Sequence, residues 1–239
     1  MIKLYLNESM IFLINKLIKQ NNIKKKNSSI KYYFFNSIYL IPISTKKNAF
    51  ANSGLRNISI PISTKKICEG AFCICNHLSK VDIPTDSLLE CIETLAFSHT
   101  LIKDFFIPSK LIVLEEKCFD DCQQINISIS KDNKNFLYYN NQIILKKSNP
   151  NNDIYDVLLL AQKDVKKENI LDDIRVIVNN AFDHCKLIEK VDISMNSNLE
   201  IIKDFAFYYS FINEITIPPK LTKICSKAFM NCYTVVSLL

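Results

Sequence analysis

Apolar residues recur along this chain in one fixed frame. Each copy holds a small residue followed by Phe, and six of the seven copies have an aliphatic residue four positions before that pair, while six apolar-x-apolar triplets follow pairs along the chain. The pairs are Ala49-Phe50, Ala71-Phe72, Ala96-Phe97, Cys118-Phe119, Ala181-Phe182, Ala206-Phe207 and Ala228-Phe229. Successive pairs are 22, 25, 22, 63, 25 and 22 residues apart. A period of about 20 to 30 residues is typical of solenoid proteins, so the pattern predicts a stack of similar turns.

The apolar-x-apolar triplets predict one short strand per turn, because alternate strand residues face the same side. They are Ile58-x-Ile60, Val81-x-Ile83, Phe105-x-Ile107, Ile127-x-Ile129, Val191-x-Ile193 and Ile215-x-Ile217. Pro61, Pro84, Pro108 and Pro218 directly follow four of these strands. Proline cannot donate to a strand ladder, so it ends the pairing and turns the chain. We expect a second apolar stretch next, then a tight turn with the Phe inside and the Ala permitting close stacking.

The spacing of 63 residues contains an extra segment. Residues 136–145 read as a strand, an Asn140-Asn141 turn and a second strand, and residues 154–161 read as a third strand. We therefore predict a repeat domain over residues 38–239, interrupted by a hairpin insertion at about 130–169. Residues 1–37 are predicted to form a basic N-terminal segment that is either a helical cap or disordered.

The formal net charge of +6 lies entirely in the first 36 residues, which hold seven lysines and one acid. The rest of the chain balances 23 basic against 23 acidic residues, which excludes a basic nucleic-acid surface on the repeats. The run Lys24-Lys25-Lys26 could touch an anionic membrane or nucleic acid, although a solvated tail explains it more simply. No run of 18 apolar residues occurs, so no transmembrane span is predicted, and the N-terminus makes a poor signal peptide.

The nine cysteines follow the repeat rather than a ligand pattern. Four share one repeat position (Cys75, Cys122, Cys185 and Cys232) and two share another (Cys68 and Cys225). Cysteines in register with core positions behave as small buried hydrophobes, so we predict free thiols, although like positions on neighbouring turns lie within reach of a bridge.

Candidate chemistry is sparse. Residues 68–77 contain three cysteines and His77, but zinc sites take ligand pairs from two separate places, and we predict no metal. His184 and Cys185 are adjacent, but neighbouring side chains do not face each other, which argues against a Cys–His nucleophile. With only two glycines the chain has no phosphate-binding loop of the Walker or Rossmann kind. We therefore predict no cofactor and no enzyme activity.

The repeats resemble leucine-rich repeats of the BspA-like type, whose units read C-x-x-L-x-x-I-x-I-P and I-x-x-x-A-F-x-x-C. Residues 75–84 and 212–232 carry this pattern, and the resemblance covers about residues 38–239. The first unit is shortened, and Ser130 and Ser194 stand in place of proline. The resemblance implies a curved solenoid with a parallel β-sheet on the concave face, a mostly irregular or short-helical convex side and one hairpin insertion. It also implies a cell-surface antigen or adhesin that binds host proteins.

Residues that flank the middle apolar position of each strand should point outward and form two columns on the concave face. We predict that protein ligands bind there, through Asn57, Ser59, Lys80, Asp82, Asp104, Phe106, Lys190, Asp192, Glu214 and Thr216. Asn126 and Ser128 occupy the same columns. The exposed aromatic Phe106 beside charged residues is typical of an interface anchor, while an ordinary solvated sheet face is the simpler interpretation.

Two further interpretations concern location and assembly. Absence of a clear signal and an odd number of cysteines favour an intracellular scaffold, whereas the family resemblance favours the cell surface or secretion. Residues 235–239 read as a strand without a polar cap, so either this is a shortened member of the family or the C-terminal edge pairs with a second copy. Sequons at Asn7, Asn27, Asn57 and Asn126 would carry glycans in a secreted protein.

Overall fold

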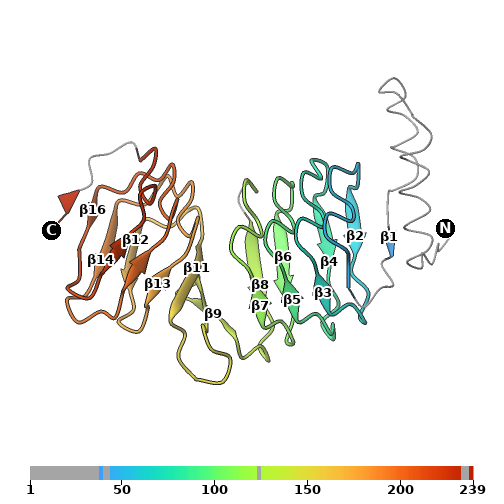
Figure 1. The fold of residues 1–239 in the computed structure, drawn as a ribbon, viewed down its shortest axis with the longest axis horizontal. Coiled ribbons are helices and arrows are strands. Elements are labelled where there is room, and N and C mark those ends of the chain that lie inside the picture. The colour runs from blue at the N-terminus through green and yellow to red at the C-terminus, as the bar shows by residue number, and fades with distance from the viewer. Residues whose placement is uncertain (1–37, 40–43, 123–124, 233–236, 239) are drawn as a thin grey trace. The chain divides into compact units, whose positions relative to one another are not determined.

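The computed structural model describes residues 38–39, 44–122, 125–232 and 237–238, and the predicted N-terminal segment 1–37 lies outside these ranges. The chain divides into two compact units, Met1–Asn133 and Lys134–Leu239, which are called unit 1 and unit 2. Each is a coil of stacked turns made of short strands and tight turns, with no helix in the described ranges (Figure 1). The repeat spacing therefore correctly predicted a solenoid.

One strand of each turn contributes to a parallel sheet that we call the strand face. In unit 1 it contains β1 (Ile38–Tyr39), β2 (Asn57–Ser59), β4 (Lys80–Asp82), β6 (Asp104–Ile107) and β8 (Asn126–Ile129). In unit 2 it contains β12 (Lys167–Ile170), β14 (Lys190–Ile193), β16 (Glu214–Ile215) and β18 (Ser237–Leu238). All pairings within these sheets are parallel, and β4 lies against β6. The predicted parallel sheet is confirmed.

A second set of two-residue strands ends at the aliphatic position of the repeat and forms what we call the short-strand face. Its members are β3 (Lys66–Ile67), β5 (Cys91–Ile92) and β7 (Val113–Leu114) in unit 1, and β13 (Val176–Ile177), β15 (Ile201–Ile202) and β17 (Lys223–Ile224) in unit 2. The proline turns connect the two faces: the Thr64 amide donates to the Pro61 carbonyl, and the Leu111 amide to that of Pro108. Each turn is thereby closed by a local hydrogen bond.

The predicted hairpin is present in unit 2. Strands β9 (Phe136–Tyr139), β10 (Ile143–Lys146) and β11 (Val157–Ala161) pair antiparallel in the order β9-β10-β11. Asn140 and Asn141 both hold left-handed backbone at the hairpin turn, which Asn tolerates better than most residues. Because β11 also pairs in parallel with β13, the hairpin extends the short-strand sheet rather than interrupting it.

The core of each unit is a stack of the repeated phenylalanines. Their rings stack from Phe50 through Phe72 and Phe97 to Phe119 at centroid distances of 5.3, 5.3 and 5.9 Å, and from Phe182 through Phe207 to Phe229 at 4.8 and 4.9 Å. The small residue of each pair lets the backbones approach: the Phe72 amide donates to the Ala96 carbonyl, and the Phe182 amide to the Ala206 carbonyl. Phe72, Phe97, Phe182 and Phe207 are fully buried, which confirms the predicted role of the Phe in the inner turns, while Phe50, Phe119 and Phe229 at the ends of the stacks are half-buried. The predicted role of Ala in close stacking is also confirmed.

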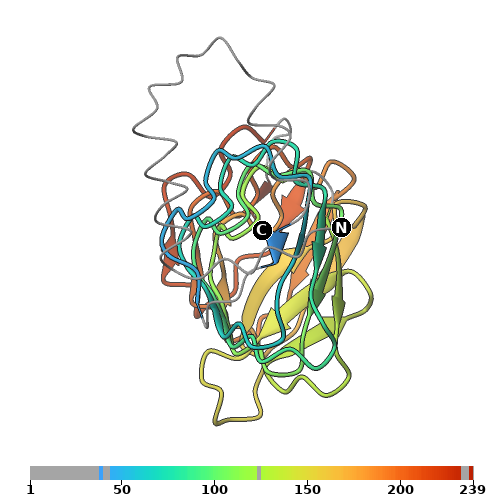
Figure 2. The ribbon, with the colours of Figure 1, turned by 90° about the vertical axis from the view of Figure 1, so that its right-hand side faces the viewer.

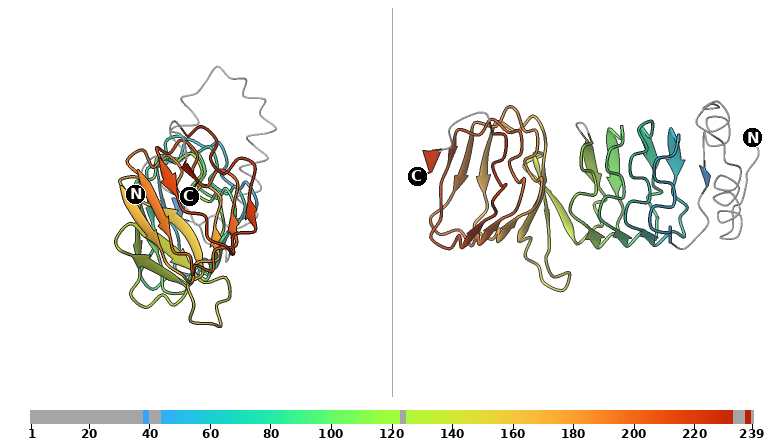
Figure 3. Two further views of the ribbon diagram at one scale, coloured as in Figure 1. Left: turned by 90° about the vertical axis from the view of Figure 1, so that its left-hand side faces the viewer. Right: turned by 45° about the horizontal axis from the view of Figure 1, so that its top comes forward.

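Figure 2 shows the turns of unit 1 (blue to green) viewed along their stack, and the left view of Figure 3 shows those of unit 2 (yellow to red). In each unit the turns project onto one another as a flattened coil. Equivalent repeat positions on successive turns therefore form columns, and these columns are what the outer surfaces present.

Candidate functional site

The strand face of unit 1 presents the two outward columns predicted from the sequence. Inward residues such as Ile58 and Phe105 are 1% and 2% exposed, and the residues between them reach solvent. The exposed members are Asn57, Lys80, Asp82, Asp104, Asn126 and Ser128, while Ser59 and Phe106 are half-buried. Strand register places Asn57 beside Lys80 and Phe106 beside Ser128. Alternation therefore predicted which side chains share this surface.

Polar contacts bind the columns of unit 1 together. Lys80 Nζ lies 2.9 Å from Asp82 Oδ1 within β4, and Asn126 Nδ2 donates to Asp104 Oδ1 at 3.1 Å between β6 and β8. Between Asn57 and Ser128, Phe106 is the one aromatic residue of these columns. It offers the apolar area that the polar residues around it lack.

In unit 2 the predicted site residues form a ladder of ion pairs. Lys190 Nζ contacts Asp192 Oδ1 at 3.0 Å and Glu214 Oε1 at 2.7 Å, and Lys167 Nζ contacts Asp192 Oδ2 at 3.1 Å. The ladder thus spans β12, β14 and β16. Thr216 follows β16 and is half-buried, as are the predicted residues Lys190, Asp192 and Glu214.

The ladder shifts the pKa values of its members. Hydrogen bonds to Glu214 and then to Asp192 raise the pKa of Lys190. Partial burial acts to raise the pKa of Asp192, but the hydrogen bonds from Lys190 and Lys167 outweigh it and the pKa lies below its ordinary value. Both shifts favour the charged forms, so the pairs persist at neutral pH.

Lys167 and Asn169 extend these columns by one strand and were not predicted. Their strand, β12, pairs in register with β14, with Lys167 beside Lys190 and Asn169 beside Asp192. The residue between them, Glu168, points inward and is 3% exposed, where the other strands carry Ile, Val, Phe or Leu. Burial raises its pKa. Because Glu168 is charged, β12 lacks the apolar-x-apolar pattern that predicted the other strands, although the spacing of 23 residues between β12 and β14 matches the repeat.

All nine cysteines are free thiols, as predicted. Three of the four thiols at the shared repeat position also donate to the carbonyl of a stacked Phe 25 residues earlier, whereas Cys185 donates to the Gln162 carbonyl. The Sγ–O distances are 3.1 Å from Cys75 to Phe50, 3.2 Å from Cys122 to Phe97 and 3.0 Å from Cys232 to Phe207. These thiols therefore link one turn to the next.

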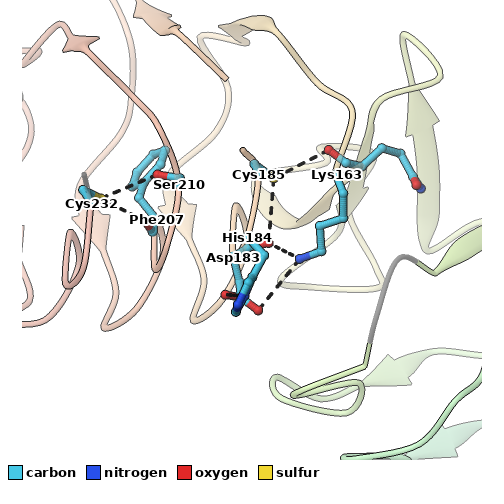
Figure 4. Close-up of polar contacts among 8 residues, drawn as sticks. Lys163, Asp183, His184, Cys185, Phe207, Ser210 and Cys232 are labelled. Atoms are coloured by element: carbon cyan, nitrogen blue, oxygen red, sulfur yellow. Dashed lines mark hydrogen bonds and ion pairs between the residues drawn. The ribbon is translucent and has the colours of Figure 1, made fainter. Parts of the chain in front are cut away.

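The adjacent His184 and Cys185 do not form a nucleophilic pair (Figure 4). Cys185 is fully buried, lies 3.6 Å from the Gln162 carbonyl, and burial raises its pKa to about 12. The imidazole of His184 instead contacts the carboxylate of Asp183. A thiol held protonated in the core is a poor nucleophile.

The described ranges contain no group of three or more His, Cys, Asp and Glu side chains placed to hold a metal. They also contain no helix of the length and apolar character needed to cross a bilayer.

Comparison with known families identifies the repeat. The BspA type leucine-rich repeat region matches residues 43–152 and 142–236, in six copies. The chain belongs to this family. Among curated proteins, none matches the sequence.

Solved leucine-rich repeat structures share the fold. The pneumococcal vaccine antigen PcpA is 16% identical with a TM-score of 0.67, covering 85% of this chain and 53% of PcpA. A leucine-rich repeat protein from Eubacterium ventriosum is 17% identical with a TM-score of 0.62, covering 85% of this chain and 61% of that protein. A leucine-rich cell surface protein from Faecalibacterium prausnitzii is 20% identical with a TM-score of 0.51, covering 77% of this chain and 60% of that protein. The chain thus spans 53% to 61% of the length of each of these proteins.

Proposed function

We propose that this BspA-type repeat protein is a non-catalytic module that binds a protein partner through its strand face, with Phe106 as the anchor. The observation that carries the proposal is a half-buried aromatic ring among the polar outward residues of β2, β4, β6 and β8. Its column also holds Ser59, Asp82 and Ser128. Aromatic residues surrounded by polar ones supply most of the binding energy in many interfaces.

The backbone of the strand face supports this role. Each of β2, β4, β6 and β8 is paired to or packed on a neighbouring strand, so the columns are already ordered before a partner arrives. A surface that is ordered in advance loses little conformational entropy on binding. In unit 2 the ion-pair ladder would have to be opened or bridged by a partner, which favours unit 1 as the primary contact.

We further propose that the protein acts as a cell-surface antigen or adhesin. Two structural neighbours support this: PcpA is described as a vaccine antigen and the F. prausnitzii protein as a cell surface protein. An intracellular scaffold is the second candidate, and the nine free thiols favour it because bridges are rare in reducing compartments.

Binding is tested on an array of extracellular-matrix and serum proteins probed with the purified chain. We expect at least one specific partner, and expect the double variant Phe106→Ala with Asp82→Ala to bind it at least about tenfold more weakly. A matched control is Asp121→Ala, which changes an exposed carboxylate in unit 1 away from the strand face. Equal binding by the double variant and the parent would exclude this surface.

Location is tested separately by protease treatment of intact source cells followed by mass spectrometry. Peptides released from unlysed cells are the expected result for the antigen or adhesin. Peptides found only after lysis would instead support the intracellular scaffold, and cytosolic partners would then be sought.

A further inference from the structure

Unit 2 carries a cluster of half-buried aromatic side chains on its Ala-Phe turns rather than on the strand face. The cluster consists of His184, Phe205, Tyr208 and Tyr209, and together with the exposed Lys227 beside it is called the aromatic turn patch. The His184 and Tyr209 rings stack at 5.1 Å and 29°, and Tyr208 meets Tyr209 edge-on at 4.4 Å. Phe205 meets Tyr208 at 5.4 Å, and Lys227 Nζ lies 5.4 Å from the Phe205 ring centroid.

The solenoid fold does not require aromatic residues at these positions. Phe205 and Tyr209 hold left-handed backbone, with φ of 60° and 49°, where an aromatic residue is disfavoured. Unit 1 fills the same two repeat positions without any aromatic ring except His99: Asn48, Gly70, Leu95 and Lys117 before the small residue, and Asn52, Ile74, His99 and Asp121 after it. Rings that are placed at conformational cost and outside the Phe stack are a sign of selection for a function.

One edge of the patch is fixed by a buried carboxylate. Asp183 is 7% exposed, its side chain contacts the imidazole of His184, and Lys163 Nζ lies 3.8 Å from its Oδ2 and also donates to its carbonyl oxygen (Figure 4). His184 is therefore oriented by its neighbours before any ligand binds. Its side chain is still 43% exposed, so the ring remains accessible.

The backbone amides of these turns already form hydrogen bonds within the solenoid. The His184 amide donates to the Tyr208 carbonyl, and the Tyr209 amide donates to the Met230 carbonyl. An extended peptide that binds by adding a strand needs such groups, so the patch does not suit that mode. What it offers instead is ring faces with a cation beside them.

We propose that the aromatic turn patch binds an acidic oligosaccharide, with the apolar face of a pyranose ring on Tyr209, the edge-on Tyr208 beside it, and its carboxylate near Lys227. The faces of aromatic rings are negative and attract the polarised C–H groups of a sugar. Lys227 attracts the carboxylate and disfavours a cationic ligand at the same position. This site differs from the protein-binding surface proposed above in its face, residues and ligand class.

The experiment is calorimetric titration of the full chain with hexasaccharides of hyaluronan, alginate and polygalacturonate, with a neutral chito-hexasaccharide and an oligoglutamate peptide for comparison. We expect at least one uronic-acid hexasaccharide to bind more tightly than both comparison ligands. Tyr209→Asn should weaken that binding at least about tenfold, as expected for loss of one stacking ring. Lys227→Gln should weaken it and reduce its dependence on salt.

The variants are chosen to keep the fold. Asn occupies the position of Tyr209 in other turns, at Asn52 and Asn231, so Tyr209→Asn suits the left-handed backbone. Ile74→Asn makes the matched change in unit 1 and should leave glycan binding unchanged. The proposal is overturned if none of the three acidic hexasaccharides binds, if Tyr209→Asn binds as tightly as the parent, or if only the neutral glycan or the peptide binds.

Discussion

At the scale of single residues, the most demanding positions are those with left-handed backbone in the Ala-Phe turns. The residue before the small one and the second residue after the Phe take positive φ in nearly every turn. Gly70 is the only glycine among them, and a side chain there would collide with that of Asn48. At the other positions L-residues adopt this left-handed conformation at an energetic cost. The cost is larger for a branched residue such as Ile74, with φ of 59°, than it would be for Asn.

We predict that Ile74→Asn stabilises the protein. Ile74 is 44% exposed, so little buried area is lost, and relief of the left-handed strain should raise the free energy of unfolding by about 1 kcal/mol. The measurement is urea unfolding followed by circular dichroism. Ile62→Asn is the control, because Ile62 is 47% exposed but lacks positive φ. A similar change in both variants would contradict the explanation.

Glu168 provides a prediction on pH. Burial raises its pKa in the folded state, so the fold favours the protonated form, and stability from this group is fully present below the unfolded pKa of about 4.3. That stability is lost as the pH rises through the folded pKa. Glu168→Gln should therefore match the parent near pH 4 and become more stable than it towards pH 7. Unfolding curves at a series of pH values check this, and parallel pH profiles would contradict it.

At the scale of elements, the turns are joined by ring stacking and by the thiol-to-carbonyl contacts beside it. Both act between neighbouring turns, since the contacts join residues 22 to 25 positions apart. Stability in such arrays comes from interfaces between adjacent units. A change at one turn should therefore affect its two neighbours most.

Phe97→Ala should lower the free energy of unfolding by about 3–5 kcal/mol because it leaves a cavity in the core. Phe97 is fully buried and contacts Phe72, Phe105 and Phe119. Phe106→Ala, on the strand face next to the core residue Phe105, should cost much less because Phe106 is only half-buried. Chemical denaturation measures both, and equal losses would contradict the assigned repeat register.

The thiols should react according to their burial. In native protein Cys75, Cys118 and Cys185 should resist a thiol reagent, because burial raises the pKa of each thiol and withholds the reactive thiolate. Denaturation without reductant should release all nine thiols for titration. A count below nine would show that some cysteines are bridged.

At the scale of the whole molecule, the chain consists of two compact units, each with its own Phe stack. Their surfaces differ. The strand face of unit 1 contains Phe106, whereas that of unit 2 contains the ion-pair ladder and its turns bear the aromatic turn patch. The proposals therefore assign protein binding mainly to unit 1 and glycan binding to unit 2.

Hydrogen exchange can test whether the units are energetically separate. Phe97→Ala should speed exchange of amides within residues 44–133 and leave residues 134–232 largely unchanged, because the lost contacts all lie in unit 1. Phe207→Ala should give the reciprocal result through its contacts with Phe182 and Phe229. Equal acceleration across both units in either variant would show that they unfold together.

The order of apolar residues determined the fold of this protein. Alternation along each strand directs Ile58 and Phe105 into the core and Asn57 and Phe106 to the outer surface. The Ala-Phe frame places the Phe rings in one stack in each unit, because burial of an apolar residue at a repeated position stabilises the fold most when the residues stacked on it are apolar too. The same frame located the hairpin, since it left a gap filled by strand-forming residues around Asn140. These features depend on local order, which the sequence contains directly.

Only the tertiary structure decided which side chains meet across turns. Strand pairing places Lys167 in the outward columns, although Glu168 interrupts the apolar pattern of its strand. Ile74 and Tyr209 have left-handed backbone although neither is a glycine, so the sequence does not predict that conformation. The ion-pair ladder and the aromatic turn patch combine residues that stacking brings together from successive turns. Such contacts depend on register and on side-chain direction between turns, and the repeat period fixes neither.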